Sequence, residues 1–367
     1  MPLTTLLLIF VTLVTFSALF NYLFLRWTRT LGTKNLAPAE ELRWSESYKP
    51  AIGGISFYII FLVSYAIYLF FQNPDLGESE EMTHFGLLIA VTVGFFTGLA
   101  DDAFNTVPWL KLAAQIGCGV LLLMFDLNIV FFEHEVLDAF LTIFWTVGMM
   151  NSINMLDNMD GITSIVSIFI LLAASIVSEP LQSTNLFYTF ICGGVLAALI
   201  GFLFFNWYPS KVFMGDTGSQ MLGALLAAIG VLFFWNNPDI SANHTWYSKL
   251  AIVGSAFVIP IADSITVTIN RIRRGQSPLV GGKDHTTHHL SYAGLNDIQV
   301  AMVMILISSI SVTFISALSY IDEANKTAFF SFQLLYVALV IVFLYSSTWW
   351  SKSRSVFEKT QLNSSTS

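Results

Sequence analysis

Long apolar stretches separated by short polar loops run along the chain from residue 3 to residue 348. Single glycines or polar residues interrupt several of them, but eleven can be delimited, at residues 3–25, 51–71, 84–100, 107–125, 137–153, 161–178, 187–205, 217–236, 249–270, 298–318 and 328–348. A helix crosses a bilayer with about 20 mostly apolar residues, whereas the strands of a membrane barrel alternate apolar and polar residues over about 10 positions. Because these stretches do not alternate, they predict an all-α, polytopic integral membrane protein with about eleven transmembrane helices.

The composition supports this class. The 367 residues are 55% hydrophobic and only 11% charged, and the mean hydropathy is +0.70, whereas soluble domains carry about 25% charged residues. We expect a single transmembrane domain over residues 1–350, which also carries the chemistry, and a polar cytoplasmic tail over residues 351–367 whose end, 361–367, is disordered. Cys118 and Cys192 lie inside apolar stretches, where we expect them to pack as small residues.

The first stretch is expected to be a retained helix with its N-terminus outside the cell. A cleaved signal peptide would begin with positive charge, but the apolar run continues to Leu25 and the first positive charge is Arg26. When eleven spans alternate from this start, fourteen of the sixteen Lys and Arg residues are cytoplasmic, as the positive-inside rule requires. These are Arg26, Arg29, Lys34, Arg43, Lys49, Lys111, Lys211, Arg271, Arg273, Arg274, Lys283, Lys352, Arg354 and Lys359.

The outer loops are short and acidic. Only Lys249 and Lys326 fall on that side, and the net charge of -8 is mostly a property of the outer face. Its acids include Asp75, Glu78, Glu80 and Glu81. The long loops 26–50 and 271–297 lie inside, so we expect a multi-pass protein of the cell inner membrane that meets its soluble ligand at the cytoplasmic face. We expect no nucleic-acid partner.

Two adjacent carboxylates, Asp101 and Asp102, end the third stretch. Negative charge at a helix C-terminus opposes the helix dipole, and charge at a membrane boundary is costly, so a merely solvated helix end is the weaker interpretation. Such a pair suits a divalent cation, a proton transfer or the positioning of a nucleophile. Lys111 follows in the next stretch, where it could reach a phosphate or extend to the interface.

Asn151, Asn154, Asp157 and Asp160 recur at every third position around the end of the fifth stretch. If the helix continues through them, neighbours in the series project from adjacent points of its surface. Helix capping explains one such residue but not the whole series. Oxygen-rich side chains at this spacing can hold a hard cation or form hydrogen bonds with a sugar or a base.

The segment from Phe213 to Ser219 begins the eighth stretch and contains Gly215, Asp216 and Thr217. One interpretation is an N-cap, in which Asp216 or Thr217 accepts from the first helical N–H groups. The other interpretation uses the same geometry for a ligand. Glycines allow close approach of the backbone, the helix N-terminus favours an anion, and Asp216 can hold Mg²⁺ beside it.

The last inner loop is basic and rich in histidine. Topology alone can explain Arg271 and Arg274, but His285, His288 and His289 gather half of the chain's six histidines within five residues. Zinc is disfavoured because no thiolate lies nearby and no His-Glu-x-x-His pattern occurs. Contacts to phosphate, as cations or as hydrogen-bond donors, fit better. Together with the carboxylates on the same predicted face, this is the equipment of phosphoryl transfer.

In these motifs the chain resembles the polyprenyl-phosphate N-acetylhexosamine-1-phosphate transferases. This family includes the enzymes that start O-antigen, enterobacterial common antigen and teichoic acid linkage synthesis, and the translocase that makes lipid I of peptidoglycan. The similarity covers nearly the whole chain. Five motifs carry it in order, namely Pro50 to Gly54, Asp101 with Asp102, the series Asn154, Asp157 and Asp160, Asn206 with Phe213 to Ser219, and Arg274 to Pro278 with His285, His288 and His289.

The resemblance implies a transfer from a UDP-N-acetylhexosamine to undecaprenyl phosphate that releases UMP and starts a lipid-linked cell-envelope glycan. It also implies Mg²⁺, with Mn²⁺ as a possible substitute. Asp216 would ligate the metal, together with Asn154. The lipid phosphate would be served by Asp101 and Asp102 as catalytic residues, with Lys111 nearby.

The remaining motif residues are implied to bind the donor. Asp160 and Asn206 would lie near the uridine, with Asp157 and Phe213 in the same substrate site. The diphosphate would be held by Arg271 or Arg274 and by the histidines, His285, His288 and His289.

Two departures from the family pattern bear on the substrate. The usual Asp-Gly-x-Asp-Gly has Asn158 in place of the first glycine, so the turn before Asp160 is expected to differ. The histidine motif lacks the third consecutive histidine and the following acid that are usual in the lipid I enzyme. This favours UDP-GlcNAc over UDP-MurNAc-pentapeptide, which stays as the alternative donor.

Other mechanisms and classes stay open at this point. The lipid phosphate has a second pKa of about 6, so direct attack needs no strict general base, and a covalent aspartyl-phosphate is the alternative. A secondary transporter is the rival class, and Asp263, within the ninth stretch, fits it best. An inactive scaffold is disfavoured by the intact acidic motifs. A homodimer is compatible with the sequence.

Overall fold

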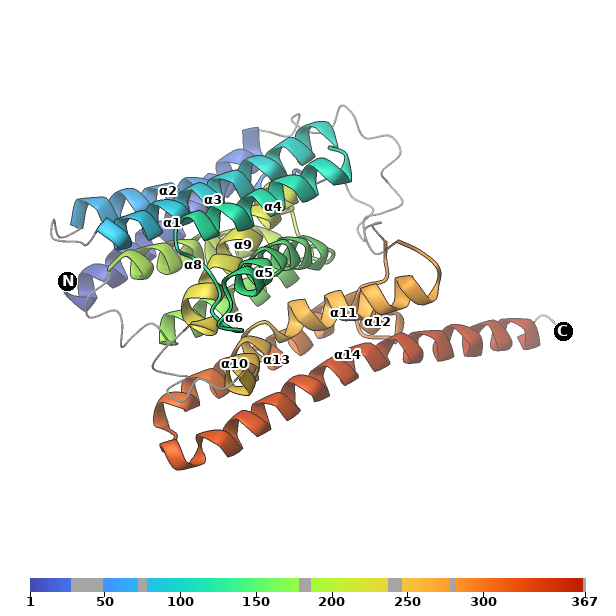
Figure 1. Cartoon of the computed structure of the whole chain (residues 1–367). Coiled ribbons are helices and arrows are strands. Elements are labelled where there is room, and N and C mark those ends of the chain that lie inside the picture. Colours follow the sequence, from blue (N-terminus) through green and yellow to red (C-terminus); the bar gives the residue numbers. More distant parts are fainter. Residues whose placement is uncertain (28–48, 72–77, 178–185, 237–245, 278–281, 366–367) are drawn as a thin grey trace.

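The computed structural model describes residues 1–27, 49–71, 78–177, 186–236, 246–277 and 282–365, and for residues 78, 79 and 351–365 it describes the backbone alone. Within these residues every named element is a helix, and the one β feature is an isolated bridge between Ala51 and Phe213. Figure 1 shows the helices side by side in one bundle, with α14 extending beyond the others towards the C-terminus. The prediction of an all-α protein is confirmed.

The helices follow the predicted apolar stretches closely. They are α1 (Leu3–Trp27), α2 (Gly53–Phe71), α3 (Glu78–Phe104), α4 (Pro108–Met124), α5 (Glu135–Leu156), α6 (Ile162–Val177), α8 (Leu186–Asn206), α9 (Gly215–Gly230) continued by a π-helical segment η2 (Val231–Trp235), α10 (Trp246–Ala256), α11 (Val258–Arg273), α12 (Thr286–Tyr292), α13 (Asp297–Ala317) with a short 3₁₀ turn η3 (Leu318–Tyr320), and α14 (Glu323–Ser365).

The polytopic character of the protein is also confirmed. Among the described residues, eight helices are long and apolar enough to cross a membrane, and the bent pair α10–α11 makes a ninth span if it is counted as one. The shorter apolar helices α4 and α6 fall on the predicted stretches 107–125 and 161–178. Each predicted stretch therefore has its helix or bent pair, while the count of eleven crossings stays a prediction because α4 and α6 are short.

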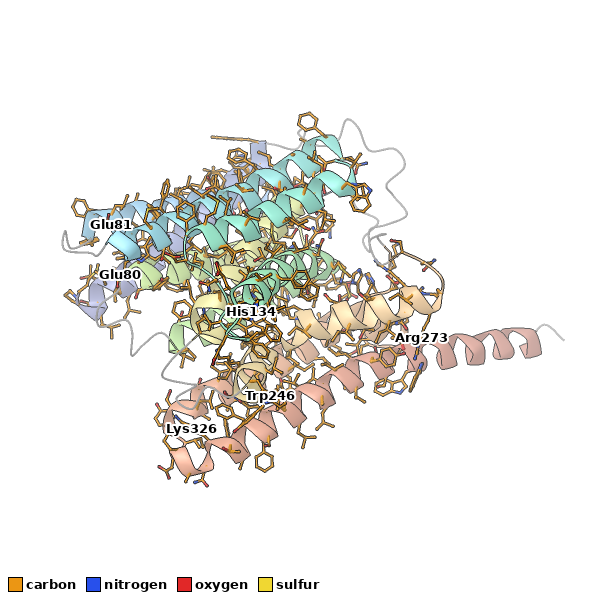
Figure 2. All side chains as sticks on the ribbon, in the orientation of Figure 1. Glu80, Glu81, His134, Trp246, Arg273 and Lys326 are labelled. Atoms are coloured by element: carbon orange, nitrogen blue, oxygen red, sulfur yellow. The ribbon has the colours of Figure 1, made fainter. Side chains whose placement is uncertain are left out.

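The two ends of the bundle separate the residues that we assigned to opposite sides. Figure 2 shows Glu80, Glu81 and Lys326 towards one end and Arg273 towards the other. Several charged residues used for the topology lie outside the described residues, or have no described side chain. These are Arg29, Lys34, Arg43, Asp75, Glu78, Lys352, Arg354 and Lys359. Pro278 of the predicted Arg274–Pro278 motif also lies outside them.

Helix α9 forms the centre of the bundle. Over the apolar span Gly215–Trp235, 94% of the residues in an 18-residue segment are buried, as expected for a helix surrounded by other helices. Helix α9 packs against α2, α3 and α5. The helix α3 approaches it closely at Gly98, where a Cβ atom would lie 2.1 Å from the carbonyl oxygen of Asp216. This contact brings the end of α3, with Asp101 and Asp102, to the beginning of α9.

The predicted stretch 249–270 is not one continuous helix. It bends by 88° between α10 and α11, a break that the apolar pattern does not indicate. Pro260 lies in the first turn of α11 and has no N–H to donate to the carbonyl of Ala256, four residues earlier. The new helix α11 then carries Asp263 and Arg271 and ends at Arg273.

Two further features differ from the sequence-based expectation. The inner loop 271–297 contains a short helix, α12, and α14 continues to Ser365 instead of ending in a disordered tail at 361. Residues 366 and 367 lie outside the described residues. Cys118 and Cys192 are buried free thiols, as expected for packing residues.

Candidate functional site

A cavity of about 1140 Å³ opens among the ends of α3, α4, α5 and α11 and the loop before α9. Twelve of the fourteen predicted site residues line it, namely Asp101, Asp102, Lys111, Asn154, Asp157, Asp160, Asn206, Phe213, Asp216, Arg271, His285 and His288. The other two, Arg274 and His289, are not among its lining residues. Motifs that are spread over almost 190 positions of the sequence therefore meet at one place in the fold.

The beginning of α9 is occupied by a carboxylate of the protein itself. Asp102, from the end of α3, accepts hydrogen bonds from the backbone N–H groups of Asp216 (3.1 Å) and Thr217 (2.8 Å) and from the Thr217 hydroxyl (2.6 Å). Neither Asp216 nor Thr217 caps the helix, because the N-cap residue is Met214 and makes no side-chain cap. The anion that we expected at this helix N-terminus is thus Asp102, which satisfies its free N–H groups and its dipole.

Gly215 makes this close approach possible. Its φ of +74° lies in the left-handed region, which residues with a side chain rarely adopt. A Cβ atom at this position would also lie 2.8 Å from Oδ2 of Asp102. The absence of a side chain at Gly215 therefore lets the carboxylate of Asp102 approach the backbone.

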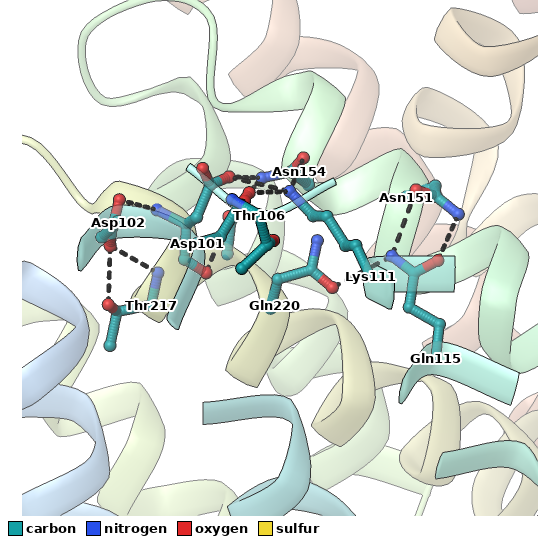
Figure 3. Close-up of polar contacts among 11 residues, drawn as sticks. Asp101, Asp102, Thr106, Lys111, Gln115, Asn151, Asn154, Thr217 and Gln220 are labelled. Atoms are coloured by element: carbon teal, nitrogen blue, oxygen red, sulfur yellow. Dashed lines mark hydrogen bonds and ion pairs between the residues drawn. The ribbon is translucent and has the colours of Figure 1, made fainter. Parts of the chain in front are cut away.

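Asp101 points away from Asp102 into a second cluster, drawn in Figure 3. Its Oδ1 accepts from the N–H (2.9 Å) and hydroxyl (2.6 Å) of Thr106, and its Oδ2 accepts from Nζ of Lys111 at 2.8 Å. The same Nζ lies 3.2 Å from Oδ1 of Asn154 and 3.3 Å from Oδ1 of Asp216. One lysine from α4 therefore joins acidic or amide side chains of α3, α5 and α9.

Asn154 and Asp216 contact each other within this cluster. The amide nitrogen of Asn154 donates to Asp216 and, at 2.8 Å, to the hydroxyl of Ser219, while its oxygen faces Lys111. Among the described residues, no group of three or more His, Cys, Asp and Glu side chains could hold a metal ion alone. Proteins usually hold Mg²⁺ with one or two carboxylates together with phosphates and waters. The donors present fit such a shared site, with Asp216, 34% exposed, and Asn154 as its protein part.

The series of polar residues from 151 to 160 does not lie on one helix face. Helix α5 ends at Leu156, so Asp157 and Asp160 belong to the turn that follows. Asn151 instead pairs with Gln115 of α4 through two hydrogen bonds, of 2.8 and 3.1 Å, as Figure 3 shows. The condition that the helix continues through the series is therefore not met, and Asn154 alone of the four residues joins the Lys111 cluster.

The far wall of the cavity is built around Asp160. Its carboxylate accepts from the N–H (2.9 Å) and the hydroxyl (2.7 Å) of Ser210 and pairs with Nζ of Lys49 at 3.4 Å. The same ammonium group lies 4.9 Å from the ring centre of Phe213. Sequence analysis counted Lys49 only as a cytoplasmic charge, although its place directly before the Pro50 motif was a signal that could have identified it.

Asn206, which the resemblance places near uridine, ties this wall together. Its Oδ1 accepts from the N–H of Gly161 (3.1 Å) and the hydroxyl of Ser164 (3.2 Å), and its Nδ2 donates to the carbonyl of Val212 at 2.9 Å. The side chain is 3% exposed. It therefore fixes the turn before α6 against the loop before α9.

In the histidine loop, residues 282–292, one carboxylate pairs with both Arg271 and Arg274. Asp284 accepts from Nε (3.1 Å) and Nη2 (2.7 Å) of Arg271 and also pairs with Arg274. Burial raises the pKa of Asp284, but the hydrogen bonds and charges of Arg271 and Arg274 outweigh it, so the pKa lies below its usual range. Both arginines that were predicted to hold a diphosphate are thus already paired with a carboxylate.

His288 of this loop is neutral at physiological pH. Burial, followed by the charge of His285, lowers the pKa of His288 to about 3, and burial also lowers the pKa of His289. A neutral imidazole can donate one hydrogen bond but brings no positive charge. Of the two contacts to phosphate that the sequence left open, His288 can therefore make only the hydrogen-bonding one.

Asp263 is the residue that fitted a secondary transporter best in the sequence. It is fully buried and accepts from the backbone N–H of Thr286 and from Nδ1 of His285. This geometry is that of a buried acid paired with one loop. It lies at the inner half of the bent span, next to the histidine loop.

Residues 84–234 match the family model described as glycosyl transferase family 4. The chain is 30% identical over 287 residues to a phospho-N-acetylmuramoyl-pentapeptide-transferase of Staphylococcus haemolyticus, with 69% of this chain and 80% of that protein covered. It is 28% identical over 268 residues to a Bacillus subtilis protein described as a probable undecaprenyl-phosphate N-acetylglucosaminyl 1-phosphate transferase, with 70% and 71% covered. It is 26% identical over 362 residues to a decaprenyl-phosphate N-acetylglucosaminephosphotransferase of Mycolicibacterium smegmatis, with 89% and 86% covered.

Proposed function

Because the chain belongs to glycosyl transferase family 4, we propose that it transfers N-acetylhexosamine-1-phosphate, and most specifically GlcNAc-1-phosphate, from its UDP-sugar to undecaprenyl phosphate. An oxygen of the lipid phosphate bonds to the β-phosphorus of the donor, and the bond from that phosphorus to the oxygen of UMP breaks. The products are a lipid diphosphate sugar and UMP. The protein would act in the inner membrane with its cavity facing the cytoplasm, because most cationic residues are assigned to that side.

One observation carries the proposal: Lys111 joins Asp101, Asn154 and Asp216 at the wall of a large cavity. Phosphoryl transfer depends on positioning and on electrostatic stabilisation more than on covalent help from the protein. An ammonium group held by a carboxylate on each side is fixed in place, and it can bind a lipid phosphate that enters beside Asp101. Asp101 then orients Lys111, and no general base is needed for a phosphate that is mostly dianionic at neutral pH.

Mg²⁺ completes this proposal. Asp216 would hold the ion together with the donor diphosphate, with the side chain of Asn154 beside it. When bound, Mg²⁺ neutralises charge on the diphosphate and on the departing UMP. Asp102 would hold the beginning of α9, and with it Asp216, in place.

The choice of GlcNAc rests on the histidine motif, which lacks the third consecutive histidine usual in the lipid I enzyme. The similar proteins include both GlcNAc and MurNAc-pentapeptide transferases by name, so UDP-MurNAc-pentapeptide is the alternative donor. A transporter is no longer favoured, because Asp263, its strongest support, has both carboxylate oxygens engaged by one loop of the protein.

The direct test uses purified protein in lipid nanodiscs with undecaprenyl phosphate, Mg²⁺ and radiolabelled UDP-GlcNAc or UDP-MurNAc-pentapeptide. We expect label from UDP-GlcNAc in the lipid fraction and an equal amount of UMP, and no transfer by Asp216→Asn protein. Lipid labelling from the MurNAc donor alone would move the protein to the lipid I branch. No labelling from either donor, with folded protein, would reject the function.

A further inference from the structure

Asp263 has an environment that differs from the other acids of the protein. It lies in α11, and its side chain is fully buried within the bundle. Its Oδ1 accepts from the N–H and from the hydroxyl of Thr286, both at 2.7 Å, and its Oδ2 lies 2.9 Å from Nδ1 of His285. A buried carboxylate is costly unless it is paired and hydrogen-bonded. All the partners named here come from two consecutive residues of one loop.

These contacts make Asp263 the cap of a helix to which it does not belong. His285 is the N-cap residue of α12, and its own side chain makes no capping hydrogen bond. The acceptor for the first N–H group of α12 is instead Asp263, which lies 23 residues earlier in the sequence. The carboxylate therefore fixes where α12 begins, and with it the position of the histidines.

The neighbouring residues of the loop are fastened to other elements. Before His285, Asp284 pairs with Arg271 at the end of α11. After Thr286, the hydroxyl of Thr287 donates to Oδ1 of Asn158 at 2.7 Å, in the turn after α5. The loop is thus held on both sides of His285 by contacts that do not involve Asp263. Losing the Asp263 contact should therefore affect the ring of His285 more than the path of the loop.

The hydrogen bond to Asp263 also determines which nitrogen of His285 faces the cavity. An ionised carboxylate only accepts hydrogen bonds, so Nδ1 must carry a hydrogen. His285 lines the cavity, and Nε2 is then the ring atom that can serve a ligand there. With an anionic oxygen at Nε2, the ring carries a hydrogen on both nitrogens, and the charge of Asp263 balances it.

We infer that Asp263 is a positioning residue that holds the ring of His285 with Nε2 towards the cavity, so that His285 can donate to a phosphate oxygen of the donor substrate. This inference rests on the proposed function for the identity of the ligand. The arrangement follows the logic of a carboxylate that holds a histidine in one tautomer and stabilises its protonated form. It gives the buried acid of the bent span a role in the transfer reaction, and the 88° bend at the start of α11 is part of the geometry that supports it.

The variant Asp263→Asn separates the two roles of the carboxylate. The amide oxygen can still accept from Thr286, which keeps the cap of α12. The amide nitrogen is a donor, so it forces Nδ1 of His285 to accept. The ring then keeps a single hydrogen, on Nε2, and loses the positive charge that would strengthen its hydrogen bond to a phosphate oxygen. We expect a thermal midpoint close to that of wild type and a kcat/KM for the UDP-sugar that is roughly 10- to 100-fold lower, the range typical of losing a group that orients a functional histidine.

A double-mutant cycle with His285→Gln tests whether Asp263 acts through this histidine. If it does, Asp263→Asn lowers kcat/KM in the wild-type background and has almost no further effect when His285 is already Gln. A drop of equal size in both backgrounds would overturn the inference. The matched control is Asp138→Asn, another buried carboxylate that accepts from backbone N–H groups, of Phe131 and Phe132, far from the cavity. It should leave kcat/KM unchanged.

The tautomer can be measured without any substrate, which separates this inference from the proposed function. Nitrogen-15 NMR of histidine-labelled protein, with His285 assigned by its loss in His285→Gln, reports which ring nitrogen carries hydrogen. We expect hydrogen on Nδ1 in wild type and on Nε2 in Asp263→Asn. A neutral ring with hydrogen on Nε2 in the wild type would overturn the inference even if the transferase activity is present. The expected tautomers in a protein with no transferase activity would reject the proposed function and leave the Asp263–His285 arrangement standing.

Discussion

Asp102 at the end of α3 binds Thr217 in the first turn of α9, with its Oδ2 accepting from both the N–H (2.8 Å) and the hydroxyl (2.6 Å). Its neighbour Asp101 instead bonds Lys111. Consecutive residues of a helix with 3.6 residues per turn project about 100° apart, so the two carboxylates face different groups. The two acids are neighbours in the sequence but have different contacts. Asp102 holds the beginning of α9, whereas Asp101 belongs to the cluster around Lys111.

The first prediction is that replacing Asp102 lowers the stability of the protein, whereas replacing Asp101 lowers its turnover. Asp102→Ala should lower the thermal midpoint in detergent, because a lost helix cap costs about 0.5–2 kcal/mol. Asp101→Asn should keep the midpoint and lower kcat by on the order of 100-fold, as when one preorganised electrostatic group is removed. Thermal unfolding and turnover of both proteins decide this. If Asp102→Ala protein is stable and Asp101→Asn protein is unstable, Asp101 is the structural residue and the prediction is wrong.

We also predict that neither acid forms a covalent intermediate. The carboxylate of Asp101 is already bonded to Thr106 and Lys111, and the dianionic lipid phosphate needs no prior activation. Wild-type protein incubated with donor labelled at the β-phosphate, without lipid acceptor, should carry no protein-bound label after denaturation. Label that maps to Asp101 or Asp102 by peptide analysis would overturn direct attack.

Asp216 should be required for metal-dependent turnover but not for folding. Asp216→Asn removes a charge that lies 3.3 Å from Nζ of Lys111, while Asp102 still caps the helix. We expect at least a 100-fold loss of rate, on the scale of removing a transition-state electrostatic group, and loss of the Mg²⁺ dependence in a titration. Asp322→Asn, at an exposed acid before α14, serves as the control and should behave as wild type. Normal Mg²⁺-dependent activity in Asp216→Asn would remove Asp216 from the metal site.

His288 should make the protein less stable as the medium becomes acidic. Burial lowers the pKa of His288 to about 3, whereas an unfolded histidine titrates near 6.5. Between these values the unfolded chain binds a proton that the folded chain does not, so stability falls with falling pH, by at most about 1.4 kcal/mol per pH unit. The thermal midpoint of wild type should therefore fall more steeply than that of His288→Gln from about pH 7 to pH 5. Parallel curves would contradict a neutral, buried His288.

The topology predicts opposite sides for Glu80 and Gln276. Glu80 lies in the first turn of α3 and Gln276 follows α11, and Figure 2 shows Glu80 and Arg273 towards opposite ends of the bundle. Reporter fusions at these two positions should give an outer signal at Glu80 and an inner signal at Gln276. Signals from one side at both positions would reject the eleven-span topology and the cytoplasmic site together.

The sequence by itself determined the class of the protein, the position of its apolar helices and the residues that could carry chemistry. This is possible because a bilayer requires long apolar segments whose backbone groups are satisfied internally, and because polar residues in such segments are rare enough to stand out. Asp101, Lys111, Asn154 and Asp216 could all be found in this way. The family could be inferred because the motifs occur in a fixed order along the chain.

Only the tertiary structure decided which groups each of these side chains contacts. The direction of a side chain depends on where its helix ends and on what packs beside it, and spacing along the chain does not contain this information. The end of α5 at Leu156 divides the series from Asn151 to Asp160 into separate groups. Likewise, the contact of Asp263 with His285 exists because the bent span returns α11 to the histidine loop, so no local pattern in the sequence could have paired them.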